Sequence, residues 1–226
     1  MITTLESTIK FNSKPVTYIP ALGFSALTPF FDSFQKWGAK EGTFKPKLIA
    51  HAGIQKNFEV LDLGCGTGTL TILVKKSQPL ADVIGIDIDP NVLSLAKEKT
   101  ANAKVHITFD LGTAFNLPYP DNFFDRVVSS LVFHHLTREN KLRALKEVRR
   151  VLKANGEIHI ADLGKPQNIL MRLPSVVMRR LEETEDNVKG LLPQMLNIAG
   201  FNEIEETSKL MTIFGTVSLY KGLKIS

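Results

Sequence analysis

Three glycines separated by single residues interrupt an aliphatic stretch of this chain. Residues 60–68 read VLDLGCGTG, and apolar residues at helical spacing follow over residues 69–76. A strand that turns through glycines into a helix lets a ligand lie against backbone N–H groups, close to the positive end of the helix. This arrangement is typical of a site for a nucleotide-like ligand that carries a carboxylate or a phosphate.

An acidic residue follows the glycine turn after about twenty residues, the distance at which ribose recognition requires a carboxylate. Residues 83–87, VIGID, indicate a second aliphatic strand that ends in Asp87. Capping of the helix that begins at Pro90 is the structural alternative for Asp87. The glycine spacing departs from the dinucleotide pattern, because Gly68 comes one residue early and Thr69 stands where that pattern has glycine.

Four segments, in order along the chain, resemble the class I S-adenosylmethionine-dependent methyltransferases. They are VLDLGCGTG at 60–68, GIDIDP at 85–90, LPYPDNFFDRVVSSLVFHHL at 117–136 and LKEVRRVLKANGEIHIAD at 145–162. The resemblance is close over residues 56–164, and the subgroup is the ubiquinone/menaquinone-biosynthesis-like type (methyltransferase type 11 group). It implies a methyltransferase that uses S-adenosylmethionine and releases S-adenosylhomocysteine.

The resemblance also implies a fold class. We expect an α/β, Rossmann-like methyltransferase fold with a doubly wound, mostly parallel seven-stranded sheet. The last strand would be antiparallel, and a helical cap would precede the sheet. Alternating strand and helix patterns in the sequence agree with this expectation.

The glycine turn should hold the amino-acid end of the cofactor. Gly64 and Gly66 would allow close backbone approach, and Thr67 would lie near the helix start. Asp62 could receive the ammonium group, or it could tie down the loop by accepting backbone N–H groups. Cys65 is expected to be a small buried side chain rather than a nucleophile, because the motif offers no cationic neighbour to activate it.

The nucleoside end of the cofactor should lie at the next two strands. Asp87 would bind the ribose, and Ile88 would cover one face of the adenine. The other adenine wall would include Thr113 and Ala114, where relatives commonly have aspartate-alanine. Thr113 replaces that aspartate, so its hydroxyl or the carboxylate of Asp110 could accept the bond from the adenine amino group.

The acceptor should enter where strand four ends. Ser130 matches a position that lines the cofactor in the resembled family, and His134 and His135 follow it. Adjacent residues of an extended segment point to opposite sides, so we expect at most one histidine to face the cleft. That histidine could be a base, and the alternative role is loop packing and hydrogen bonding. Asp162, at the end of strand five, is a further candidate for catalysis or substrate contact.

Composition narrows the function classes. The 226-residue chain has a net charge of +5 and one cysteine, so we expect neither an internal disulfide nor a cysteine-built metal site. No basic run with interleaved aromatics predicts nucleic-acid binding, and no apolar run predicts a signal peptide or a membrane span. We therefore expect a cytoplasmic protein that acts on a small molecule without a metal. The oligomeric state stays open.

The elements that must position these residues follow from the apolar patterns. Strands are predicted at 57–63, 82–87, 104–109, 124–131 and 156–162, and helices at 67–77, 90–100 and 138–153. Asn155 and Gly156 are expected to end the last of these helices. Another helix is predicted near 188–199 with a stop at Gly200, and β runs follow at 203–213 and 215–222.

We expect residues 1–226 to form a single domain with four parts. Residues 1–55 would be a helical cap or lid in which Tyr18 and Trp37 face the substrate, although packing against the sheet is an alternative for its aromatic residues. Residues 56–164 would bind the cofactor, 165–187 would be an insertion or lid, and 188–226 a C-terminal helix and β hairpin. The apolar, arginine-bearing stretch 169–181 indicates a hydrophobic or amphiphilic acceptor, or simply a lid helix that covers core.

Two other function classes remain open at this point. A non-catalytic S-adenosylmethionine-binding protein or subunit would have the same fold and the same glycine turn. An NAD-dependent oxidoreductase is disfavoured by the glycine spacing. Methyl transfer to a small molecule by in-line displacement is the leading interpretation.

Overall fold

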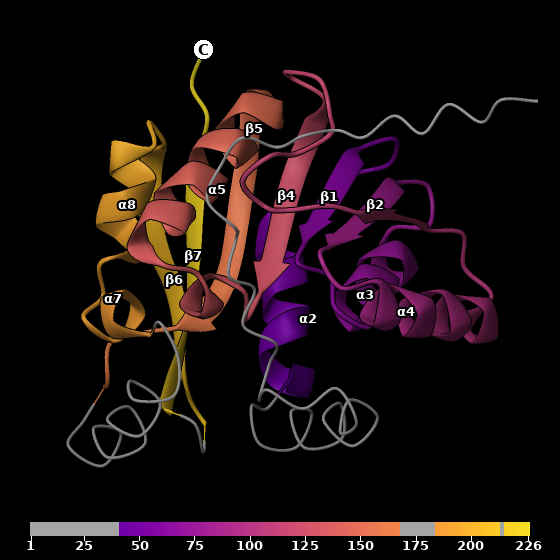
Figure 1. Cartoon of the computed structure of the whole chain (residues 1–226), viewed down its shortest axis with the longest axis horizontal. Coiled ribbons are helices and arrows are strands. Elements are labelled where there is room, and N and C mark those ends of the chain that lie inside the picture. The colour runs from indigo at the N-terminus through magenta and orange to yellow at the C-terminus, as the bar shows by residue number, and fades with distance from the viewer. Residues whose placement is uncertain (1–40, 168–183, 213–214) are drawn as a thin grey trace, which may run out of the picture.

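A computed structural model describes residues 41–167, 184–212 and 215–226. Its centre is a seven-stranded sheet in the order β3-β2-β1-β4-β5-β7-β6 (Figure 1). The strands are β1 Glu59–Leu63, β2 Asp82–Asp87, β3 Thr108–Leu111, β4 Phe124–Ser130, β5 Leu152–Leu163, β6 Asn202–Thr212 and β7 Gly215–Leu223. The helices are α2 Glu41–Ala52, α3 Thr69–Ser77, α4 Pro90–Ala103, the short 3₁₀ turn η3 Phe133–His135, α5 Arg138–Val151, α7 Glu185–Val188 and α8 Leu192–Ile198.

The strand directions confirm the predicted fold class. Strands β1 to β5 pair in parallel, and β7 runs antiparallel to both β5 and β6. The carboxyl ends of the parallel strands therefore meet at one edge, the lower edge in Figure 1. In α/β sheets, ligands bind outside this edge.

Helices cover both faces of the sheet. Because side chains of a strand alternate between faces, Leu61 packs on the side of α5 and α8, whereas Val60 packs on the side of α2 and α3. Both side chains are fully buried. The two buried layers fix the sheet between the helices, so the loops at its carboxyl edge extend from a rigid base.

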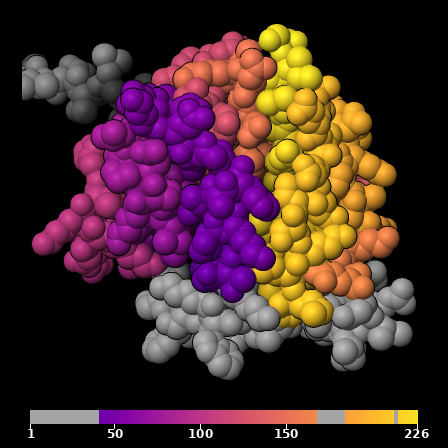
Figure 2. Space-filling model, turned by 180° about the vertical axis from the view of Figure 1, so that it is seen from behind, coloured from indigo at the N-terminus to yellow at the C-terminus, as the bar shows by residue number. Residues whose placement is uncertain are grey.

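Helix α2 packs on the sheet face shown in Figure 2, where its indigo residues lie beside the yellow C-terminal strands. Phe44 and Leu48 are buried together with Leu70 of α3, and His51 Nδ1 lies 2.8 Å from Thr207 Oγ1 of β6. The remainder of the expected cap, with Tyr18 and Trp37, lies outside the described residues, as does the stretch 169–181. The four-part division of the chain stays a prediction.

One predicted helix end is wrong. Helix α5 ends at Val151, and Asn155 and Gly156 lie inside β5 rather than at a helix stop. Asn155 has a φ of 62°. Phe124 pairs with Leu152 and Arg126 pairs with Glu157, so residues 153–156 form an irregular bulge in β5. Asn155 thus has the left-handed backbone expected at a helix stop, but it has it inside a strand.

Two further boundaries differ from the sequence prediction. Helix α4 continues to Ala103 because Lys104, with a φ of 53°, forms a left-handed cap without glycine, and β3 therefore starts only at Thr108. The predicted helix near 188–199 corresponds to α8, which starts only at Leu192, because Gly190, with a φ of 74°, separates it from α7. The predicted stop at Gly200 is confirmed by its φ of 93°.

Candidate cofactor and active site

The glycine loop after β1 has left-handed backbone at each of its three glycines. The φ values are 68° at Gly64, 51° at Gly66 and 74° at Gly68, a region that favours glycine. A Cβ atom at Gly64 would meet Val132 at 2.5 Å, and one at Gly68 would meet Ala96 at 3.0 Å. A Cβ atom at Gly66 would meet nothing within 4 Å, so the middle glycine borders open space.

Asp87 closes this loop from the end of β2. Its Oδ2 accepts the N–H of Gly66 at 2.8 Å, and its Oδ1 accepts the N–H of Asp89 at 3.1 Å. Burial raises the pKa of Asp87, and these N–H bonds oppose that effect. Asp89, not Asp87, caps α4, because its side chain accepts the N–H of Asn91 at 2.8 Å. The helix-capping alternative for Asp87 is thus excluded.

The loop after β3 begins beside Asp87. Gly112 donates its N–H to the carbonyl of Asp87 at 2.9 Å, so the following residues Thr113 and Ala114 start next to the end of β2. Ile88, which directly follows Asp87, is half-buried. Asp110 accepts the hydroxyl of Tyr119 at 2.9 Å, which occupies part of the carboxylate that was the alternative to Thr113.

Two residues of α5 hold the far end of the same loop. Arg150 donates to the carbonyl oxygens of Leu117 at 3.0 Å and Tyr119 at 2.8 Å. Glu147 accepts the N–H of Leu117 at 2.9 Å, and the bond from Arg150 lowers the pKa of Glu147. Sequence reasoning missed both residues, because their partners lie about thirty positions away and only the fold brings them together.

Asp62 ties the glycine loop to the start of α3. Its Oδ2 accepts the hydroxyl of Thr71 at 2.6 Å, and the side chain is buried. Burial raises the pKa of Asp62 to about 6, against the lowering effects of Thr71 and of the charge of Lys45 on α2. This geometry supports the role of tying down the loop over a direct contact with an ammonium group.

Thr67 and Cys65 lie in the glycine loop, and their side chains contact other protein groups. Lys99 of α4 donates to Thr67 Oγ1 at 2.6 Å, a contact that sequence reasoning missed. Lys99 follows Ala96 by three positions and so shares the helix face that packs against Gly68, a neighbourhood that only the fold reveals. Cys65 is buried, as expected, and burial raises the pKa of its thiol. A protonated, enclosed thiol is a poor nucleophile.

Asp162, at the carboxyl end of β5, is fully buried among donors. Its Oδ2 accepts the N–H groups of Val132 at 3.1 Å and Phe133 at 2.7 Å, and its Oδ1 lies 2.8 Å from His134 Nδ1. Burial alone would raise the pKa of Asp162, but His134 and the N–H bonds outweigh burial and lower it. These bonds order the loop after β4. The catalytic or substrate role expected for Asp162 stays a prediction.

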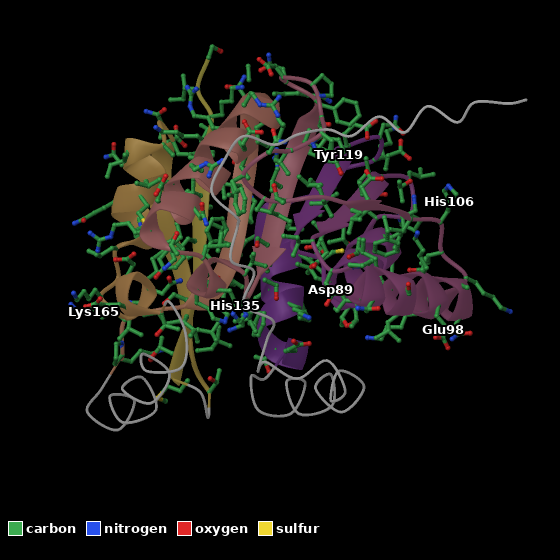
Figure 3. The ribbon with its side chains drawn as sticks, viewed as in Figure 1. Asp89, Glu98, His106, Tyr119, His135 and Lys165 are labelled. Atoms are coloured by element: carbon green, nitrogen blue, oxygen red, sulfur yellow. The ribbon has the colours of Figure 1, made fainter. Side chains whose placement is uncertain are left out.

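The two histidines lie side by side rather than on opposite sides. Ser130 ends β4, Leu131 turns the chain with a φ of 60°, and residues 133–135 form the 3₁₀ turn η3 instead of an extended segment. The ring centroids of His134 and His135 are 4.0 Å apart. Burial, followed by the charge of His134, lowers the pKa of His135 to about 3, so this ring is neutral. Figure 3 shows His135 and Asp89 at the same edge of the sheet.

The short helix α7 adds partners to this loop that sequence reasoning missed. Asn187 Nδ2 donates to Asp162 Oδ1 at 3.2 Å. Asp186 forms ion pairs with Arg138 and Lys141 in the first turns of α5, and these pairs lower its pKa. Residues 186 and 187 thus fasten α7 to the histidine loop. No sequence motif marks them.

The described residues offer neither a metal site nor a membrane-spanning helix. No group of three histidine, cysteine or acidic side chains lies close enough to hold a metal ion in the described part of the chain. None of the helices described is long and apolar enough to cross a membrane. The cytoplasmic location stays a prediction.

Residues 60–156 match the family model described as "Methyltransferase domain". Among similar sequences, a demethylmenaquinone methyltransferase of Lactobacillus johnsonii is 32% identical over 156 residues, 66% of this chain and 63% of the relative. A demethylmenaquinone methyltransferase of Staphylococcus aureus is 35% identical over 124 residues, 54% of this chain and 50% of the relative. The chain thus spans less than two thirds of the length of these curated relatives.

Solved structures resemble the fold at lower sequence identity. The YcgJ protein of Bacillus subtilis superposes with a TM-score of 0.67 at 19% identity, over 80% of this chain and 98% of that chain. A putative methyltransferase of Bacillus halodurans gives 0.65 at 20% identity, over 80% and 99%. At this level of sequence identity, the comparison shows a shared fold.

Proposed function

We propose that this chain, a member of the class I S-adenosylmethionine-dependent methyltransferase family, transfers a methyl group from that cofactor to a small-molecule acceptor. The observation that carries the proposal is the contact of Asp87 with Gly66. It sets a half-buried carboxylate beside bare backbone at the carboxyl edge of the sheet. A carboxylate suits the vicinal hydroxyls of a ribose.

The residues present fit the cofactor on a point of geometry. Gly64 and Gly68 are packed against Val132 and Ala96, whereas nothing lies within 4 Å of the Cβ position at Gly66, so the backbone at Gly66 is open to a ligand. In this proposal Gly64, Gly66 and Thr67 lie along the amino-acid end, and Asp87 holds the ribose. The residues that we assign to the adenine and the sulfur side are Ile88, Thr113, Ala114 and Ser130.

The chain has little chemistry left to perform once the cofactor is bound. The cofactor supplies an activated methyl group and a neutral leaving group. The protein contributes position: the glycine loop and Asp87 hold the donor, and the loop after β4 orients the acceptor for in-line displacement. Asp162 keeps that loop in place through Val132 and Phe133.

We assign the acceptor contact to His135 rather than to His134. His134 is engaged by Asp162 and buried, whereas His135 is only partly buried. A neutral imidazole can accept a hydrogen bond from an acceptor hydroxyl or take up its proton. Because curated relatives are named for demethylmenaquinone, a hydrophobic or amphiphilic ring compound is the first acceptor class to test.

Calorimetry with S-adenosylhomocysteine tests the cofactor, and transfer of a labelled methyl group to 1,4-dihydroxynaphthalene or to a metabolite extract tests the reaction. We expect binding and label transfer with the wild type, and weaker binding with reduced transfer in Asp87→Ala. Absence of binding in the wild type would refute the proposal. Binding without transfer to any acceptor would instead support the non-catalytic alternative.

A further inference from the structure

Helix α2 carries a buried ammonium group that neither the sequence motifs nor the proposed reaction uses. The side chain of Lys45 is 8% exposed and that of its partner Glu41 is 9% exposed. Lys45 Nζ donates to Glu41 Oε2 at 2.8 Å. Charged side chains are seldom buried to this degree unless their hydrogen bonds are complete.

Among the described residues, one hydrogen bond of the Lys45 ammonium group is found. An ammonium group has three N–H donors, and in the described part of the chain Glu41 is the one partner found for them. An ion pair between residues four apart stabilises a helix in water, but it gives no reason to bury the pair. The two remaining donors therefore call for a further acceptor, and a positive charge favours an anionic one.

The position of Lys45 points to the glycine loop. Its neighbours Phe44 and Leu48 pack with Leu70 and Val74 of α3, the helix that starts directly after the loop. The first turns of α2 lie at the lower edge in Figure 1, the edge at which the parallel strands end. Lys45 is also close enough to Asp62 for its charge to act on that carboxylate.

We infer that Lys45 binds the carboxylate of the cofactor's amino-acid end, while Glu41, one turn away, accepts from its ammonium group. The inference rests on the proposed function, since it assigns the cofactor's charged end to α2. A zwitterion complements a buried lysine and a buried glutamate, because each ligand charge meets the opposite protein charge. Asp62, which accepts a hydrogen bond from Thr71, then does not contact the ammonium group of the cofactor.

Three adenosine compounds separate this assignment from a structural role. They are S-adenosylhomocysteine, its decarboxylated form (which keeps the ammonium group) and 5′-methylthioadenosine (which has neither charged group). In calorimetry, the wild type should bind S-adenosylhomocysteine about tenfold or more tightly than the decarboxylated form, as expected for a hydrogen bond between charged groups. Lys45→Met should abolish that difference by weakening S-adenosylhomocysteine alone.

Matched variants complete the experiment. Lys47→Met, at an exposed position of the same helix, should bind all three compounds like the wild type. Glu41→Gln should weaken both compounds that carry an ammonium group and leave 5′-methylthioadenosine unchanged, which tests the inference even if Lys45→Met does not fold. Lys45→Arg should keep part of the discrimination.

Two results would overturn the inference. The first is a wild type that binds S-adenosylhomocysteine and its decarboxylated form equally. The second is a parallel loss of affinity for all three compounds in Lys45→Met and Glu41→Gln, which would show a structural ion pair. In both cases the proposed function would stand, whereas a wild type that binds none of the three compounds would refute the proposed function itself.

Discussion

The carboxylate of Asp87 lies 2.8 Å from the backbone nitrogen of Gly66, so the acid that ends β2 closes the loop that follows β1. Each carboxylate oxygen can accept more than one hydrogen bond. Asp87 can therefore hold the loop and still accept from a ligand. This double use makes Asp87 the residue whose replacement is most informative.

We predict that Asp87→Ala weakens S-adenosylhomocysteine binding by about 10- to 100-fold, the effect of one or two hydrogen bonds to a charged group. Asp87→Asn should lie between the alanine variant and the wild type, because one amide oxygen can still accept from Gly66. Asp89→Ala is the matched control: it should cost about 1 kcal/mol of stability through the lost helix cap and leave calorimetric affinity unchanged. Equal losses of affinity at positions 87 and 89 would contradict the assignment.

Asp62 should make stability fall as the pH rises through about 6. Its folded pKa of about 6 lies above the ordinary 3.8, so its contribution is fully present below pH 3.8 and is lost as the carboxyl ionises in the folded state. Two pKa units correspond to about 3 kcal/mol. Urea unfolding between pH 4 and 8 should show this decrease in the wild type but not in Asp62→Asn. Asp82→Asn, at the exposed start of β2, is the control and should show the same dependence of unfolding free energy on pH as the wild type. An equally large decrease of the unfolding free energy in Asp62→Asn would contradict the prediction.

Arg150→Met should weaken S-adenosylhomocysteine binding about three- to tenfold without a direct contact, because the loop that carries Thr113 and Ala114 loses the bonds at Leu117 and Tyr119. The adjacent Arg149 donates instead to the carbonyl of Gly200, between α8 and β6. Arg149→Met should therefore reduce the melting temperature and leave calorimetric affinity unchanged. The prediction fails if both variants bind like the wild type.

Asp162→Asn should destabilise the protein by about 3 to 5 kcal/mol, because it removes the buried negative charge beside His134. Its single amide oxygen can accept from Val132 and Phe133, but the amide nitrogen cannot replace the second carboxylate oxygen as an acceptor. Asp125→Asn, whose carboxylate bonds Lys153 near the surface, should cost about 1 kcal/mol or less. Thermal unfolding compares the two variants. If Asp162 contacted the acceptor instead of ordering the loop, Asp162→Asn would lose methyl transfer at near wild-type stability.

The parallel strands could be predicted from the sequence because strands buried on both faces are continuous aliphatic runs. Strand β2 has the predicted bounds 82–87 for this reason. The bulge at Asn155 and the cap at Lys104 could not be predicted in the same way. A bulge is defined by the register with a neighbouring strand, and the left-handed lysine replaces the glycine that normally marks a helix end.

The site shows the same division between local and distant information. Gly66 and Asp87 are fixed by a motif within one βαβ unit, and the structure brings them together as that motif requires. Lys45, Arg150 and Asn187 lie outside the motif. The packing of α5 and α7 brings Arg150 and Asn187 to their partners, and the packing of α2 against α3 brings Lys45 near the glycine loop. The histidine turn misled the sequence argument because alternation holds only for extended backbone, and η3 is helical.

The placement of β7 between β5 and β6 has a consequence for synthesis on the ribosome. Residues 215–223 pair with both neighbours, so β5 keeps an unpaired edge until these late residues emerge. Such long-range pairing slows folding, and an open strand edge invites association with other chains. A nascent chain stalled before residue 215 should therefore bind chaperones. A chain whose β7 has left the ribosome should no longer bind them.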